Sequence, residues 1–171
     1  MLYARANFRG SFAGTFPMTD LVTLTMASPV GWLAIRGHDD TIVALDWVDQ
    51  AQPRSNAKLL NEAAQQLEAY FSDDLQYFDL PLDPQGTDHQ KKVWNDMLTI
   101  PYGGLRSYGY MAKTIGSSAR AVGTARGKNP IPIIVPCHRV IATGGGMGGY
   151  SGRGGLETKR ALLILEGVML A

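Results

Sequence analysis

The sequence contains one cysteine among its 171 residues, at position 137. A single thiol excludes an intramolecular disulfide and a zinc site built from several thiolates, and it favours a reducing compartment. No apolar run approaches the ~20 residues needed to cross a bilayer. Residues 1–20 also lack the continuous apolar stretch of a signal peptide, and we interpret them as a loose leader. We therefore expect a cytoplasmic protein, associated with the nucleoid if its source is prokaryotic, with no membrane partner.

Acidic residues are scarce in the second half of the sequence. Between Arg106 and Arg160 there are nine Lys or Arg residues and one acid, Glu157, although the net charge of the chain is only +1. Such a cationic segment is typical of a surface that meets phosphates. A solvated basic face explains the charge alone equally well. The chain as a whole, with 45% apolar and 18% charged residues, has the composition of a globular protein.

The hydrophobic periodicity divides the chain into two parts. Residues 21–48 alternate apolar and polar residues in short runs, broken at residues 28–29 and 37–40, which predicts three antiparallel strands. Ser55 is predicted to cap a helix whose apolar residues recur at helical spacing up to Phe71. We expect an α/β (α+β) fold, with an N-terminal lobe of sheet and helix over residues 1–80, a linker over residues 81–86 and a second domain over residues 87–171.

The second domain contains a predicted helix-turn-helix. Thr87 is predicted to cap the first helix of the domain, which precedes the helix-turn-helix. Ser107 is predicted to cap a short helix that ends at Gly116. The segment SSARAV begins another short helix, which runs to about residue 126. Two short helices joined by a glycine turn are a weak signal for DNA binding when taken alone. The second helix strengthens it, because that helix presents Arg120 and Arg126 and no acid.

The segment PCHR places the thiol of Cys137 beside an imidazole. A thiol is mostly protonated at neutral pH, so a reactive cysteine needs a base, and His138 follows directly. The preceding segment PIPIIVP predicts an extended strap, in which neighbouring side chains point to opposite faces, so we expect a bridging water between thiol and imidazole. Glu166, at the end of a helix predicted over residues 156–166, is the candidate to orient the imidazole, because an acid there opposes the helix dipole. An inert buried thiol and a solvated terminal acid are the alternative interpretations.

A glycine-rich loop follows this motif. Residues 143–155 hold eight glycines, with Tyr150 and Ser151 among them. Because glycine lets the backbone approach a ligand closely, we predict a binding wall with an aromatic face and polar groups. A flexible hinge is the alternative interpretation.

Taken together, these motifs resemble one protein family. The segment NPIPIIVPCHRVI, with RSYG and SARAVG before it and GYSG and LLILEG after it, is similar to the O6-alkylguanine-DNA alkyltransferases, also called methylated-DNA–protein-cysteine methyltransferases, over about residues 87–167. The resemblance implies a winged helix-turn-helix domain that binds double-stranded DNA by the minor groove and flips out O6-alkylguanine, with O4-alkylthymine as a second candidate lesion. It also implies irreversible transfer of the alkyl group to Cys137 in a single turnover, because a thioether has no leaving group for water to displace.

The resemblance also assigns roles to individual residues. It implies that Cys137 is the nucleophile, that His138 is its water-mediated base and that Glu166 orients the imidazole. Asn129 would brace the helix-turn-helix against the active site, and Tyr108 would donate a hydrogen bond toward the leaving guanine.

The remaining assignments concern the base pocket and the DNA. The carbonyl groups of Cys137 and Val140 and the amide of Ser151 would bind the flipped guanine, while Arg120 would fill the vacated stack. The segment YSGRGGL is longer than the commoner YSGGL form, which brings Arg153 within reach of phosphate or the lesion. The predicted substrate and DNA contacts are Arg120, Ala121, Gly123, Arg126, Val140, Tyr150, Ser151 and Arg153.

The same resemblance implies a monomer without a cofactor. Some relatives bind zinc through cysteines and histidines of the first lobe, but this chain has no cysteine there, so we expect no metal. Two other functions stay open. A cysteine hydrolase would use Cys137, His138 and Glu166 and would turn over on an ester substrate. A protein that binds alkylated bases without transfer would not need the thiol.

Overall fold

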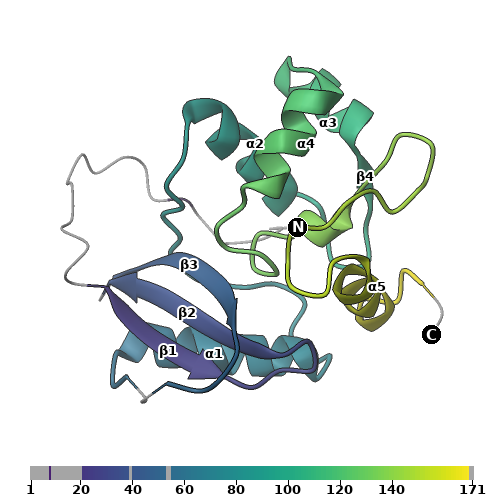
Figure 1. Cartoon of the computed structure of the whole chain (residues 1–171). Helices are drawn as coiled ribbons and strands as arrows, with labels where there is room; N and C mark the ends of the chain where they lie inside the picture. Colours follow the sequence, from purple (N-terminus) through teal and green to yellow (C-terminus); the bar gives the residue numbers. More distant parts are fainter. Residues whose placement is uncertain (1–7, 9–20, 39, 53–54, 170–171) are drawn as a thin grey trace. The chain divides into compact units, whose positions relative to one another are not determined.

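The computed structural model describes residues 8, 21–38, 40–52 and 55–169 (Figure 1). Its contacts separate two compact units, and the chain passes from the first to the second between Gln85 and Gly86. Apart from Phe8, the predicted leader lies outside the described residues. None of the described helices has both the length and the apolar composition that crossing a bilayer requires.

The first unit is an antiparallel sheet packed against one helix. Strands β1 (Val22–Met26), β2 (Trp32–His38) and β3 (Thr41–Val48) lie in the order β1-β2-β3, as the alternating pattern predicts. Figure 1 shows α1 (Lys58–Phe71) lying along this sheet. The helix buries Leu60, Ala63, Leu67 and Tyr70, whose spacing places them on one face.

Two predictions about the first unit are wrong in detail. Helix α1 begins at Lys58 rather than at a Ser55 cap, because the Ser55 hydroxyl accepts the N–H of Ala57 at 3.1 Å and closes a turn before the helix. The predicted linker over residues 81–86 includes Leu82, which pairs with Ile42 and is fully buried. Its apolar side chain completes the first core, so this part of the segment belongs to the folded unit.

The second unit starts with the helices of the predicted helix-turn-helix region. Thr87 caps its first helix through a capping box with Gln90. Ser107 and Ser118 cap the two short helices, and Gly116, with φ of 67°, ends the first of these in the left-handed conformation that glycine favours. The predicted caps at Thr87 and Ser107 are therefore confirmed. The helices are α2 (Asp88–Leu98), α3 (Tyr108–Ile115) and α4 (Ala119–Gly127).

A short parallel ladder and a last helix complete the second unit. Strand β4 (Arg106–Ser107) pairs with β5 (Val140–Ile141), which follows the single-turn 3₁₀ helix η2 (Cys137–Arg139). Helix α5 (Leu156–Leu165) is the last of the described helices and packs against η2. Trp94 of α2 donates its indole N–H to the Ala125 carbonyl of α4 at 2.9 Å, which fixes the helix-turn-helix on the rest of the unit.

The segment before Cys137 is a compact turn and not the predicted extended strap. The N–H of Val135 donates to Ile131 O at 2.9 Å, and that of Ile134 donates to Pro132 O at 2.9 Å. Ile133 adopts a φ of 73°, which a β-branched residue rarely takes. Ile131, Ile133 and Val135 have no exposed area, so folding back lets this short segment bury all three side chains.

Candidate active site

Helix η2 presents the thiol, the imidazole and a guanidinium on consecutive buried residues. Cys137 is 1% exposed and His138 is fully buried. The N–H of Arg139 donates to Pro136 O at 3.1 Å, and that of Cys137 donates to Val135 O at 2.8 Å. A 3₁₀ turn separates successive side chains by about 120°. The thiol and the imidazole therefore do not point to opposite faces, as they would in the extended segment that the sequence predicts.

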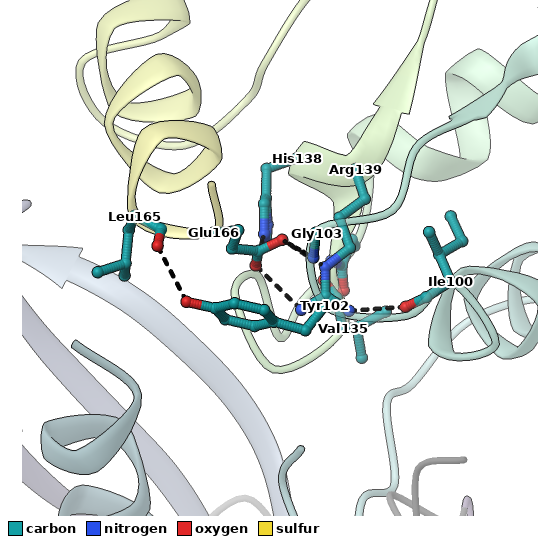
Figure 2. A network of polar contacts seen from close by, with 9 residues as sticks. Ile100, Tyr102, Gly103, Val135, His138, Arg139, Leu165 and Glu166 are labelled. Carbon is teal, nitrogen blue, oxygen red and sulfur yellow. Dashed lines mark hydrogen bonds and ion pairs between the residues drawn. The ribbon is translucent and has the colours of Figure 1, made fainter. Parts of the chain in front are cut away.

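Glu166 lies at the centre of a polar network, at the C-cap of α5 (Figure 2). Its Oε1 accepts hydrogen bonds from His138 Nε2 at 2.7 Å and from Arg139 Nη2 at 2.9 Å. Its Oε2 accepts from Arg139 Nε at 2.9 Å and from the Gly103 N–H at 3.3 Å. The remaining Arg139 nitrogen, Nη1, donates to Ile100 O at 2.7 Å. This network holds the imidazole in one orientation.

The network also determines the proton on the imidazole. Burial by itself raises the pKa of Glu166, but the hydrogen bonds and charges of His138 and Arg139 lower it to about 2. Glu166 is therefore ionised, and His138 Nε2 must carry the proton of their hydrogen bond. Burial lowers the pKa of His138, and Glu166 acts against that shift. The imidazole is neutral at pH 7, and its buried Nδ1 has no partner among the described residues, so Nδ1 is available to accept a proton.

Asn129 supports the turn that leads to the thiol. Its Nδ2 donates to Val135 O at 2.9 Å, while its Oδ1 accepts the N–H of Ile131 at 3.0 Å. Both bonds join the turn to Asn129, which lies two residues after the end of α4. They therefore tie the end of α4 to the turn that precedes Cys137.

The surroundings of Cys137 have opposing effects on the pKa of its thiol. Burial raises the pKa of the thiol, while a hydrogen bond with Asn129 and the charges of Arg126 and Lys159 lower it. Burial raises the pKa of the Tyr150 phenol, and the nearby Cys137 acts in the same direction. At rest the thiol is protonated, and both cations favour its ionised form.

Lys159 joins the two sides of the glycine-rich loop. The side chain is fully buried, and its Nζ donates to Val140 O at 2.6 Å and to Met147 O. Burial, followed by the nearby charge of Arg126, lowers the pKa of this amine to about 8. Met147 lies within the loop and Val140 before it, so the ammonium group fixes the loop to β5.

Tyr108 forms the other wall beside the loop. It is the first residue of α3, and the loop passes it so closely that a Cβ at Gly148 would lie 3.2 Å from its ring. Gly148 has a φ of 66°, so glycine is required there for both reasons. Burial raises the pKa of Tyr108. The phenol is therefore a hydrogen-bond donor at neutral pH.

The predicted DNA contacts divide into exposed and buried residues. Arg120 is exposed near the start of α4, and Ser151 and Arg153 are exposed in the loop. Ala121 and Gly123 are half-exposed on the same helix as Arg120. Arg126, which the sequence places among the DNA contacts, is buried instead. Arg126 is 6% exposed, because its position on α4 faces inward with Val122 and Ala125.

Two residues of the site escaped the sequence analysis. Arg139 was overlooked although it is part of the PCHR segment, because its bidentate contact with Glu166 depends on tertiary structure. Lys159 carried a signal in the sequence. It lies three and four residues before Leu162 and Leu163, on the apolar face of a predicted helix, where a lysine is rarely placed without a partner.

The fold and the site together define a class of protein. A buried thiol, a neutral imidazole oriented by a carboxylate and a helix-turn-helix belong to one unit, which is the arrangement of a DNA-binding protein with a nucleophilic cysteine. Within the described ranges, no group of three or more His, Cys, Asp or Glu side chains is arranged to hold a metal ion.

Comparisons with known families agree with this class. The model of the ribonuclease-like domain of 6-O-methylguanine DNA methyltransferase matches residues 21–84, and the model of the DNA binding domain of the same family matches residues 88–168. The chain therefore belongs to the 6-O-methylguanine DNA methyltransferase family.

Individual relatives match most of the chain. A methylated-DNA–protein-cysteine methyltransferase of Mycobacterium tuberculosis is 47% identical over 150 residues, which cover 83% of this chain and 90% of that protein. The crystal structure of Mycobacterium tuberculosis O6-methylguanine methyltransferase gives a TM-score of 0.76 at 45% identity, over 85% of this chain and 92% of that one. A Mycobacterium tuberculosis structure in complex with DNA gives a TM-score of 0.75 at 46% identity, with the same coverage.

Proposed function

We propose that this protein repairs duplex DNA by transferring the alkyl group of O6-alkylguanine to the sulfur of Cys137. The observation that carries the proposal is the buried thiol of Cys137 next in sequence to a buried imidazole, that of His138, whose Nε2 donates to Glu166 Oε1 at 2.7 Å. The relatives supply the substrate class, since they are methylated-DNA–protein-cysteine methyltransferases and one Mycobacterium tuberculosis structure is a complex with DNA.

The chemistry follows from the protonation states. The thiol proton passes to His138 Nδ1 through a bridging water, and the resulting imidazolium is stabilised by the ionised Glu166. The thiolate attacks the alkyl carbon, an S–C bond forms and the bond between that carbon and O6 breaks. The electron pair of the broken bond stays on the guanine, and the Tyr108 phenol donates a hydrogen bond toward the developing charge. No cofactor is needed, because the lesion carries its own leaving group.

The flipped base fits between β5 and the glycine-rich loop. The carbonyl of Val140 already accepts from Lys159 Nζ, but a carbonyl has two lone pairs, so one remains for the guanine amine. The Cys137 carbonyl and the Ser151 amide complete the base contacts, and Tyr150 lines the same pocket. On the DNA side, we assign the duplex contacts to the exposed or half-exposed residues Arg120, Ala121, Gly123 and Arg153.

Intact-mass measurement tests the transfer. After incubation with excess duplex DNA that contains O6-methylguanine, each molecule should gain one methyl group on Cys137 and then stop. The Cys137→Ser variant should gain none while it still binds the duplex. Multiple turnover on an ester substrate would support the cysteine hydrolase instead. Loss of the lesion without any mass change on the protein would contradict transfer to the thiol.

A further inference from the structure

Arg126 is a buried cation whose hydrogen-bonding capacity is unfilled. The side chain is 6% exposed, and its Nε and Nη1 atoms are buried without an acceptor among the described residues. Its guanidinium carbon lies 5.7 Å from the centre of the Tyr108 ring, so the group is held over an aromatic face. A buried guanidinium that lacks acceptors is unfavourable, which calls for an explanation in this position.

Among the described groups on which this guanidinium acts, none is an anion at rest. Its charge acts on Tyr108 of α3, on Cys137 of η2, on Tyr150 of the glycine-rich loop and on Lys159 of α5. Two of these are phenols and one is an amine whose Nζ already donates to two carbonyls. The thiol is the remaining group of the four, and it is the one that loses a proton in the transfer reaction.

The buried guanidinium of Arg139, which comes from η2, shows the contrast. Arg139 makes two hydrogen bonds to Glu166, at 2.9 Å each, and a third to Ile100 O at 2.7 Å. Its charge is balanced at rest by the carboxylate. Glu166 uses both of its oxygens on Arg139, on His138 and on the Gly103 N–H. That carboxylate is therefore committed to a different network and does not serve Arg126.

We propose that the guanidinium of Arg126 is the counter-charge of the Cys137 thiolate during alkyl transfer. The inference rests on the proposed function and adds a positioning residue to it. When the thiol proton moves to His138, the negative charge forms beside a cation that is already desolvated and held over Tyr108. When the S–C bond forms and the O6–C bond breaks, the sulfur becomes neutral. The negative charge is then on the guanine, which keeps the electron pair of the broken bond. The thioether is neutral, and Arg126 is again without a counter-ion.

The single cysteine allows a direct test without DNA. Iodoacetamide alkylation of Cys137 is followed by intact mass from about pH 5 to pH 10 for the wild type, Arg126→Met, Arg126→Lys and the matched control Arg160→Met. Arg160 is exposed on α5, so its replacement makes the same change in net charge at a distance from the thiol. We expect Arg126→Met to shift the profile upward by about one pH unit, which is a tenfold loss of rate near neutrality. Arg126→Lys should retain most of the wild-type profile, and Arg160→Met should coincide with the wild type.

A profile of Arg126→Met that coincides with the wild type would overturn the proposal. Lys159, whose pKa is about 8, also ionises in this range, and His138, Tyr108, Tyr150 and Glu166 complete the ionisable surroundings. All of these groups are shared by the variants, so the displacement between profiles reports the change at Arg126. An equal fall of the rate at every pH would also overturn the proposal, because it indicates a packing role.

A second measurement covers the case in which Arg126→Met does not melt cooperatively. In the wild type, the ratio of the iodoacetate rate to the iodoacetamide rate should exceed the ratio for glutathione, because a cation beside the sulfur favours the anionic reagent. A ratio equal to or below that of glutathione would overturn the proposal.

Transfer from O6-methylguanine duplex DNA is measured in parallel with these variants. If the wild type transfers nothing, the proposed function fails while the thiolate test still stands. If Arg126→Met loses duplex binding but keeps the wild-type alkylation profile, Arg126 is a phosphate contact and the proposal is wrong.

Discussion

The two units of the described chain differ in the polar groups that they bury. Up to Gln85, the buried polar side chains are the hydroxyl residues Thr25 and Thr41, each of which has a backbone acceptor. From Gly86 on, the buried set consists of Thr158 and five ionisable residues: Arg126, His138, Arg139, Lys159 and Glu166. Burying ionisable groups is costly unless they are paired. The second unit therefore bears the free-energy cost of burying the ionisable side chains around the reactive thiol, while the first unit has a conventional apolar core.

A second difference lies within the second unit, between the buried guanidinium groups of Arg139 on η2 and Arg126 on α4. Arg139 is fully engaged with Glu166 and Ile100 O, whereas Arg126 has two nitrogens that find no acceptor in the described part of the chain. Arg139, through Glu166, fixes the imidazole of His138. Arg126 favours the negative charge of the Cys137 thiolate, which exists only during the reaction. The predictions below test this division.

The largest expected effect comes from breaking the buried ion pair between Glu166 and Arg139. Glu166→Gln removes the charge that pairs with Arg139 and leaves a buried guanidinium without its counter-ion. We expect a loss of about 3–5 kcal/mol in the free energy of unfolding, measured by denaturant titration at pH 7. The matched control is Asp46→Asn in the first unit, whose ion pair with Arg36 at 3.3 Å is solvent-exposed. The control should cost about 1 kcal/mol or less.

The stability difference between the wild type and Glu166→Gln should also depend on pH in the acidic range. The pKa of Glu166 is lowered from an ordinary value of 4.5 to about 2 on folding, so its ionisation stabilises the fold above the higher value. This contribution is lost as the pH falls through the folded pKa. The stability gap between the wild type and Glu166→Gln should therefore narrow below about pH 4. A gap that stays constant down to pH 2 would contradict the pairing of Glu166 in the folded state.

The fold was predictable from the sequence where local chemistry decides it. The caps at Thr87 and Ser107 and the left-handed stop at Gly116 depend on hydrogen bonds within a few residues. The strand order follows from alternation and short connections. Ser55 failed as a cap because its hydroxyl closes a turn of its own with the N–H of Ala57. The turn at residues 131–135 failed as a strap because burial of its apolar side chains outweighs the extended preference of its prolines.

The site was predictable in its reactive groups and less so in their surroundings. Cys137 and His138 are adjacent in sequence, and Glu166 was found from its unfavourable place at a helix end. The contacts of Arg139 and Lys159, and the burial of Arg126, arise from packing between segments far apart in the chain. No local pattern determines which of several basic residues faces inward. The structure is needed to separate the cations that meet DNA from those that surround the thiol.

Methylation of Cys137 should destabilise the protein by a smaller amount. The sulfur belongs to a residue that is 1% exposed, next to the packed turn of residues 131–135, so added carbon has little room. Overpacking costs about 1–3 kcal/mol, and for a protein of this size each kcal/mol lowers the melting temperature by roughly 2–4 °C. Thermal melting of unmodified and methylated protein, each verified by mass and free of DNA, measures the difference. An unchanged or raised midpoint would show that the pocket has room for the methyl group.

The smallest expected effect separates the two arginines of α4. Arg120 is exposed while Arg126 is buried, so Arg120→Ala should leave the thiol chemistry intact and weaken only the reaction that requires flipping a base from a stack. We expect a loss of about tenfold, or ~1.4 kcal/mol, in transfer from O6-methylguanine duplex DNA and an unchanged rate with free O6-benzylguanine. Arg160→Ala, which removes an exposed arginine from α5, is the matched control and should change neither rate. If Arg120→Ala slows both substrates equally, Arg120 supports the fold or the pocket, and the division between a DNA-facing and a thiol-facing arginine on one helix is wrong.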